Sequence, residues 1–204
     1  MKNIREEIVY YMRRLYRQKL TTTSGGNISA KTSKYIYITP SGIDKARVQA
    51  KQIGKLKHTG ELVQSDFPLS METPMHTAIY QKREDVKAIV HAHSPYATAY
   101  TASSKKINAQ LTSEGALVLG EIAWAPYALM GTQDLADIVA EQAEKSNLIL
   151  MENHGVVALG KNLTEAFDRL EVLEFTAQMN FITQCLGEAK PLNAKQIIEI
   201  KNRI

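Results

Sequence analysis

Three short apolar segments constrain the fold of this chain more than any other feature. They are "VKAIVHAH" (86–93), "NLILMEN" (147–153) and "GVVALG" (155–160). Each is short, rich in valine, isoleucine or leucine, and bounded by polar residues or glycine, which is typical of buried strands. Because helical patterns separate the first segment from the other two, we expect a central sheet covered by helices.

The segments around these strands carry the usual signals of helix starts and turns. "NISAK" (27–31) and "YIYIT" (35–39) predict a hairpin or meander, and a further strand is expected around Leu62. The stretch 43–61 is polar and has no clear pattern. The order of elements predicts a single α/β or α+β domain over residues 1–204, without repeats or linkers. Helices are expected to begin near Ile4, at Thr73 as N-cap with Pro74 following, at Ser94, at Thr132, and at Asn162 or Thr164.

The charge of the chain gives no reason to expect a nucleic-acid partner. The net charge is +4, but lysine and arginine alternate with acids along most of the chain. The densest basic group is Arg13, Arg14, Arg17 and Lys19, which we interpret as the solvated face of the first helix. A mildly positive field would suit an anionic small molecule.

Cysteine content and hydropathy favour a soluble cytoplasmic protein with no membrane partner. The single cysteine, Cys185, excludes a disulfide or a thiolate metal site within one chain. The segment "MKNIREEIVYYMRRLY" is amphipathic and contains acids, unlike a signal peptide, and the apolar runs elsewhere are too short to span a membrane.

Two of the five histidines stand one residue apart at the end of the first apolar segment. Residues i and i+2 of a strand share a face, so His91 and His93 present both imidazoles to one side. Catalytic zinc commonly takes three protein ligands, and His154 in an Asn-His-Gly turn is the candidate third. The pattern alone leaves open that these histidines bind no metal. His76 is expected to pack within its helix and His58 to be exposed.

Two glycine-bearing turns are candidates for binding an anion. "SGGNIS" (24–29) and "TPSG" (39–42) offer backbone N–H groups beside small side chains. Neither has the lysine and spacing of a Walker loop, and either one alone is more often a simple turn. Together with Ser70 they form a candidate site for one phosphate.

These pieces together resemble the class II aldolase and adducin family, especially its L-fuculose-phosphate aldolase branch. The resemblance runs from about Thr21 to about Cys185. The motifs that carry it, in chain order, are "SGGNIS", "YITPSGI", "LSME" with a following histidine, "IYQKREDVKAIVHAHS", "APYALMGTQDLA" and "ENHGVVALGKNLTEAF".

The resemblance implies a fold, an assembly and a reaction. The fold would be an α/β/α sandwich around a mostly antiparallel sheet, and the assembly a homotetramer with active sites between subunits. The reaction would be cleavage of a ketose 1-phosphate to dihydroxyacetone phosphate and a small aldehyde, with zinc as a Lewis acid. By resemblance, the zinc ligands are His91, His93 and His154, the catalytic carboxylate is Glu72, and the phosphate residues are Gly26, Asn27, Ser41, Gly42 and Ser70.

This sequence departs from that branch at several positions, and the departures keep other functions open. Met71 replaces a phosphate-binding serine, Thr112 stands where a tyrosine reaches a neighbouring subunit, and no tyrosine follows Tyr127. Glu114 is a second acid/base candidate, by resemblance to methylthioribulose-1-phosphate dehydratases. Glu72 argues against the epimerase branch, which has aspartate there. Dehydration, epimerisation or decarboxylation at the same site, and a non-catalytic adducin-like module, are the alternatives.

Overall fold

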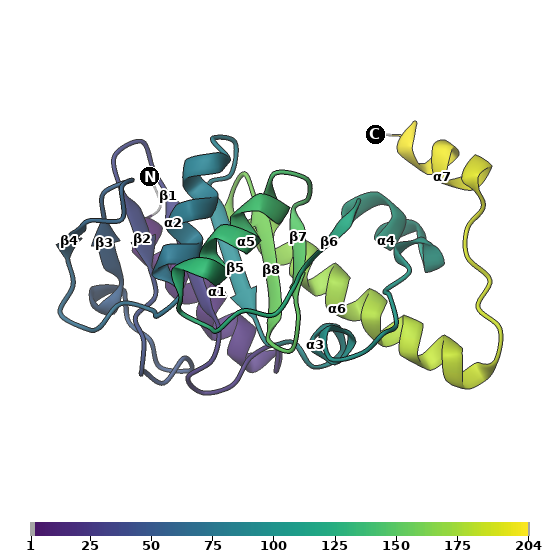
Figure 1. Cartoon of the computed structure of the whole chain (residues 1–204), viewed down its shortest axis with the longest axis horizontal. Coiled ribbons are helices and arrows are strands. Elements are labelled where there is room, and N and C mark those ends of the chain that lie inside the picture. The colour runs from purple at the N-terminus through teal and green to yellow at the C-terminus, as the bar shows by residue number, and fades with distance from the viewer. Residues whose placement is uncertain (1–2, 204) are drawn as a thin grey trace.

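The computed structural model describes residues 3–203 and is built on one eight-stranded sheet (Figure 1). The strands lie in the order β4-β3-β2-β1-β5-β8-β7-β6, and all neighbours are antiparallel except β6 and β7. The sheet is therefore mostly antiparallel, as expected. The strands are β1 Asn27–Lys31, β2 Ile36–Ile38, β3 Gly54–Leu56, β4 Leu62–Gln64, β5 Ala88–Ala92, β6 Ile122–Ala125, β7 Leu148–Met151 and β8 Gly155–Gly160.

Helices cover both faces of the sheet, so the three-layer α/β/α architecture is confirmed. One face packs against α1 (Ile4–Arg17), α3 (Pro95–Thr101) and α6 (Leu163–Leu186). The opposite face packs against α2 (Thr73–Lys82) and α5 (Gln133–Ala143). The remaining helical segments are η1 Ala50–Gln52, η2 Ala109–Leu111, α4 Ser113–Val118 and α7 Ala194–Lys201.

Side-chain alternation along the central strands divides the core into two clusters. In β5, Ala88 and Val90 pack toward α1 and α6, whereas Ile89 packs toward α2 and α5. His91 has the same parity as Ile89 and therefore faces the α2 layer. In the adjacent β1, Asn27 and Ser29 pair with His91 and Ile89 respectively and also face α2. A polar strip thus forms on the α2 side of β1 and β5.

Most of the predicted helix starts are confirmed, with one shift. Ser94, Thr132 and Asn162 are the N-caps of α3, α5 and α6. Thr73 was expected to cap α2, but Glu72 occupies that position and Thr73 is the first helical residue. The Thr73 hydroxyl donates instead to the Ser70 carbonyl at 2.6 Å, which closes the turn before the helix.

The basic residues of α1 are less solvated than expected. Arg14 donates to both carboxylate oxygens of Glu171 on α6, at 2.6 and 2.8 Å, and Arg13 donates to the Val48 carbonyl. These residues fasten α1 to its neighbours, so the interpretation as a solvated face holds only for Arg17 and Lys19, which are exposed.

The C-terminal part of the chain lies away from the sheet. In Figure 1, α6 extends beyond the strands and α7 lies beside α4, which it contacts. None of the residues of α7 is buried. Within residues 3–203, no helix is both long enough and apolar enough to span a membrane.

Candidate metal centre

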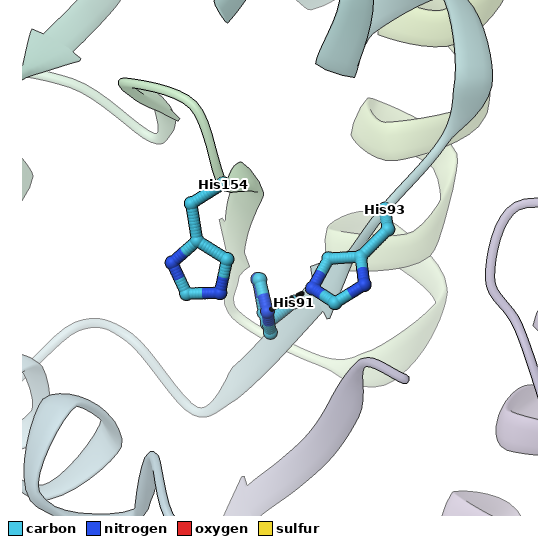
Figure 2. Close-up of side chains that lie close together, drawn as sticks. All are labelled: His91, His93 and His154. Atoms are coloured by element: carbon cyan, nitrogen blue, oxygen red, sulfur yellow. Dashed lines mark hydrogen bonds between the residues drawn. The ribbon is translucent and has the colours of Figure 1, made fainter. Parts of the chain in front are cut away.

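Three histidines converge where β5 and β8 meet. His91 lies in β5, His93 directly follows that strand, and His154 lies in the turn between β7 and β8. One ligand nitrogen from each lies within 4.8 Å of the others, and Figure 2 shows the His91 ring between those of His154 and His93. The His91 and His93 Nε2 atoms are 3.1 Å apart. Antiparallel pairing of β5 with β8 brings together residues more than sixty positions apart.

The carboxylate of Glu72 bridges two of these histidines. Its Oε2 lies 2.9 Å from His91 Nε2, and its Oε1 lies 3.0 Å from His154 Nε2. His91 Nδ1 lies 3.0 Å from the Val156 carbonyl, which can only accept, so Nδ1 carries a proton. The His91 Nε2 that faces the carboxylate then carries a second proton, accepts from His93 Nε2 at 3.1 Å, or gives its lone pair to a cation.

The charges in this cluster depend strongly on one another. Burial opposes ionisation of Glu72, but His91 and His154 outweigh it and hold the pKa of this carboxyl well below its usual range. Burial lowers the His91 pKa, yet the neighbouring carboxylate raises it overall. Burial and the other two imidazoles lower the pKa of His93 to about 4, so this ring is neutral at pH 7 and able to act as a ligand.

A chain of buried hydrogen bonds runs from Glu72 into the core. Asn27 Nδ2 donates to Glu72 Oε2 at 3.0 Å, and Asn27 Oδ1 lies 2.5 Å from His76 Nε2. His76 Nδ1 lies 2.7 Å from the hydroxyl of Ser29, which lies 2.8 Å from the Tyr80 hydroxyl. Because Asn27 Oδ1 can only accept, His76 must carry its proton on Nε2. Burial lowers the His76 pKa to about 3, which keeps this ring neutral.

The predicted phosphate turns border the same cavity, whose volume is about 100 Å³. The turn at Ser41 is held by its N–H, which donates to the Pro68 carbonyl at 2.9 Å. The Ser70 hydroxyl accepts from the Glu72 N–H at 3.3 Å. The side chain of Asn27 is engaged by Glu72 and His76. The cavity is lined by Ser24, Gly25, Gly26, Asn27, Ser41, Lys45, Ser70, Met71, Glu72, His91, His93, Met130 and His154.

Two glycines make room for the histidine cluster. A Cβ on Gly155 would lie 2.6 Å from the Ala92 carbonyl and 2.8 Å from the His93 ring. Gly26 has φ +64, and a Cβ there would lie 2.7 Å from the His91 carbonyl oxygen. Only glycine fits at either place without displacing the strand that carries the histidines.

These residues fit a divalent metal ion. Three imidazoles and a carboxylate are the donor types that zinc and similar metals bind. Glu72 Oε1 is buried and has His154 Nε2, at 3.0 Å, as its one polar neighbour given among residues 3–203. His91 is oriented by the Val156 carbonyl, as metal-binding histidines usually are. His91, His93 and His154 would hold the metal, with Glu72 beside it.

The other predicted residues fall in different places. Glu114 is exposed on α4, and neither it nor Thr112, the N-cap of α4, lines the cavity. Gly42 has φ +65 in the Ser41 turn but is not among the lining residues. Met71 lies at the rim. His76 is buried and hydrogen-bonded, and His58 is exposed.

Sequence reasoning missed two lining residues. Lys45 lies in the polar stretch after the Ser41 turn, where a lysine would ordinarily be expected at the surface. Met130 lies in the "APYALMGTQDLA" motif, which contributes to the family resemblance but does not by itself indicate that Met130 lines the site. No local pattern marks either position.

Known proteins with a similar sequence and fold belong to the family that the sequence resembles. The family model described as Class II Aldolase and Adducin N-terminal domain matches residues 6–181. A solved L-fuculose 1-phosphate aldolase superposes with a TM-score of 0.90 at 30% identity, covering 100% of this chain and 96% of that one.

Three relatives show the range of activities among similar proteins. An L-fuculose phosphate aldolase of Methanococcus maripaludis is 39% identical over 86% of this chain and 95% of its own length. A 5-deoxy-D-ribulose 1-phosphate aldolase of Bacillus thuringiensis is 35% identical over 92% and 89%. A 3-oxo-tetronate 4-phosphate decarboxylase of Haemophilus influenzae is 29% identical over 98% and 96%. Since the family model spans most of the chain, this protein belongs to the class II aldolase and adducin family, most like its fuculose-phosphate aldolases.

Proposed function

We propose that this protein is a zinc-dependent aldolase that cleaves a ketose 1-phosphate to dihydroxyacetone phosphate and a small aldehyde. L-fuculose 1-phosphate and 5-deoxy-D-ribulose 1-phosphate are the first candidates, from the names of its relatives. The observation that carries the proposal is the position of Glu72, between two histidines and in one cavity with the phosphate turns. We also propose that residues 1–204 form a single domain.

The proposed reaction divides the cavity into two ends. At one end, the turns at Gly26–Asn27 and Ser41–Gly42, with Ser70, bind the phosphate and orient the substrate. At the other end, zinc held by His91, His93 and His154 would supply Lewis-acid stabilisation of charge on the substrate oxygens. The metal removes the need for a Schiff-base lysine.

Glu72 is placed to move the proton that the reaction requires. Cleavage of a carbon–carbon bond beside a ketone leaves negative charge that must be quenched at carbon, and a carboxylate can carry that proton. Asn27 holds Glu72 Oε2 by a 3.0 Å hydrogen bond, whereas Oε1 faces the Nε2 atom of His154, a proposed metal ligand, at 3.0 Å. Because no amide or backbone group among residues 3–203 holds Oε1, we assign proton transfer to this oxygen.

We further propose a cytoplasmic homotetramer, with active sites between subunits. The family resemblance suggests this assembly, and several large apolar side chains are exposed, as expected of surfaces that pack against another subunit. These include Trp124, Tyr127, Leu129, Phe175 and Phe181. Glu114 remains a candidate to serve the cavity of a neighbouring copy.

The test is product analysis with the zinc-loaded protein. L-fuculose 1-phosphate, D-ribulose 1-phosphate and 5-deoxy-D-ribulose 1-phosphate would be supplied separately, and release of dihydroxyacetone phosphate measured. Release that requires the metal and is lost in a zinc-loaded Glu72→Gln protein is the expected result. No release from any ketose 1-phosphate, despite stoichiometric zinc, would reject the aldolase.

Decarboxylation of a 3-oxo sugar-acid phosphate is the second candidate. It is favoured by the Haemophilus influenzae relative, which matches this chain over nearly its full length. The same site would serve, because loss of CO₂ beside a ketone also leaves negative charge on the ketone oxygen. Carbon dioxide and dihydroxyacetone phosphate released together from 3-oxo-tetronate 4-phosphate, with no aldehyde formed and no cleavage of any ketose 1-phosphate, would identify this reaction.

A further inference from the structure

Lys45 is a buried lysine beside the predicted phosphate turns. It is 1% exposed and is among the largest fully buried residues of the part of the chain that the structure describes. Its backbone N–H donates to the Thr23 carbonyl at 2.9 Å, and its Nζ donates to the Pro40 carbonyl at 2.8 Å. The side chain therefore lies between the two glycine-bearing turns, and it lines the cavity that Ser41 and Ser70 also line.

The ammonium group of Lys45 has no counter-charge of its own. Among residues 3–203, no carboxylate lies within ion-pair distance of Nζ; the adjacent Asp44 pairs with Arg47, at 3.7 Å. The other titratable groups of the cavity are Glu72 and the three histidines, which contact one another. Burial lowers the Lys45 pKa to about 8, so the amine is still mostly protonated at pH 7.

A buried cation with one carbonyl partner lacks most of its hydrogen bonds. An ammonium carries three donors, and the Pro40 carbonyl takes one. Burying a charge is costly unless it is paired, so a lysine in this position calls for an anion. The two turns offer N–H groups and hydroxyls but no charge, and Met71 has replaced one expected hydroxyl.

We propose that the Lys45 ammonium group binds the substrate phosphate directly and supplies the positive charge that the two turns lack. This inference rests on the proposed function, because it takes the ligand of the turns to be a phosphate dianion. In this role, Lys45 is a substrate-binding residue that increases the affinity for the phosphate. The bond-breaking step at the histidine end does not involve it.

A merely structural role predicts something different. If Lys45 only tied its loop to the Pro40 carbonyl, a neutral donor such as glutamine would replace it, and charge would be irrelevant. If it neutralises phosphate, arginine should restore binding and glutamine should not. The pair Lys45→Gln and Lys45→Arg therefore separates the two roles.

The experiment measures binding of inorganic phosphate to the zinc-loaded full chain by calorimetry at pH 7. We expect Lys45→Gln to raise the dissociation constant by about 10- to 100-fold, the size typical of a lost charged hydrogen bond. Lys45→Arg should stay within about fivefold of the natural protein. Lys51→Gln, which removes an equal charge from an exposed lysine outside the cavity, is the matched control and should not change the dissociation constant.

A second measurement uses the unmodified protein and does not depend on whether the variants fold. Sulfate remains a dianion from pH 8 to 9.5. Any change in its affinity over this range therefore reflects a change in the charge of the protein. Because the Lys45 ammonium is lost above about pH 8, sulfate affinity should fall by up to tenfold per pH unit from pH 8 to 9.5. Affinity that is flat over this range would overturn the proposal.

The outcomes separate this inference from the proposed function. Phosphate binding that is equally strong in Lys45→Gln and the natural protein would reject the role of Lys45 alone. Failure of the natural zinc-loaded protein to bind phosphate, together with no turnover, would reject both, since no phosphate would then reach Lys45. A raised KM for the ketose phosphate in Lys45→Gln, with kcat at saturation within about threefold, would support the assignment.

Discussion

Two parts of the cavity differ in burial. We call Glu72 and the three histidines the floor, and Met71 and Met130 the rim. On the floor, Glu72 is 7% exposed and His91 1%, and both are held by bonds from β1, β8 or neighbouring imidazoles. At the rim, Met71 is 60% exposed and Met130 57%. The floor is pre-organised by the fold, whereas the rim is shaped by side chains that the sheet does not hold in place.

This difference bears on how one fold serves several reactions. Relatives named as aldolases and as a decarboxylase are similar to this chain over most of its length. A buried floor of histidines and a carboxylate suits any reaction that leaves charge beside a carbonyl. The rim is where substrates that differ in their remote atoms would be distinguished. Changes to the floor should therefore abolish chemistry, and changes to the rim should adjust affinity or selectivity.

The largest effect is expected from removing a histidine of the floor. His154→Gln should lower zinc affinity by more than about 100-fold, because a three-ligand site loses one ligand. Metal content after dialysis, measured by mass spectrometry, checks this directly. His58→Gln, at an exposed histidine outside the cavity, should keep its zinc. Full zinc retention in His154→Gln would show that the triad is not the metal site.

The next largest effect is expected from Glu72→Gln. The shape of the side chain is preserved and the proton carrier is lost, so kcat should fall by about 10²- to 10⁴-fold. Zinc content should stay near one per chain, because the three histidines remain. Glu84→Gln, at an exposed residue beyond α2, provides the control. Equal loss of zinc and activity would instead make Glu72 a metal ligand rather than the proton carrier.

A smaller effect is expected on the pH dependence of folding, through His76 beneath the floor. The folded pKa of about 3 lies below the ordinary value of 6.5, so only the unfolded chain takes up this proton between the two values. His76 should therefore lower stability as pH falls from 6.5 toward 3, by up to about 1.4 kcal/mol per unit.

The test compares denaturant unfolding of the natural protein and His76→Gln at pH 7, 6 and 5. The difference in free energy of unfolding between the two should shrink as pH falls, because the variant has no such proton to take up. Parallel profiles at all three pH values would contradict the neutral, buried state of His76.

The smallest effect is expected at the rim. Met71→Ser restores the hydroxyl present in the fuculose-phosphate aldolase motif, and one neutral hydrogen bond should lower KM by about two- to tenfold. The kcat value should change little, because Met71 lies at the exposed rim and Glu72, the proposed proton carrier, is buried. A fall in kcat of more than tenfold would show that the rim and the floor are not independent.

Local patterns were sufficient for the central strands, for most of the long helices and for the histidines as candidate ligands, but they did not predict β3, β6, α4 or α7. Apolar segments marked β5, β7 and β8, and Ser94, Thr132 and Asn162 marked helix starts, because burial and capping act within a few residues. The spacing of His91 and His93 placed two imidazoles on one face by strand geometry alone. The resemblance supplied the role proposed for Glu72.

The arrangement of the site was decided by long-range pairing. The β1–β5 register sets Asn27 opposite His91, and the start of α2 places Glu72 between His91 and His154. Burial of Lys45 follows from the approach of the two turns, and nothing in its neighbouring residues indicates it. Sequence periodicity records which face of an element is buried. It does not record which distant element covers that face, so the hydrogen bonds of Glu72, Asn27 and His76 and the burial of Lys45 emerge only when the sheet and its two helical layers are assembled.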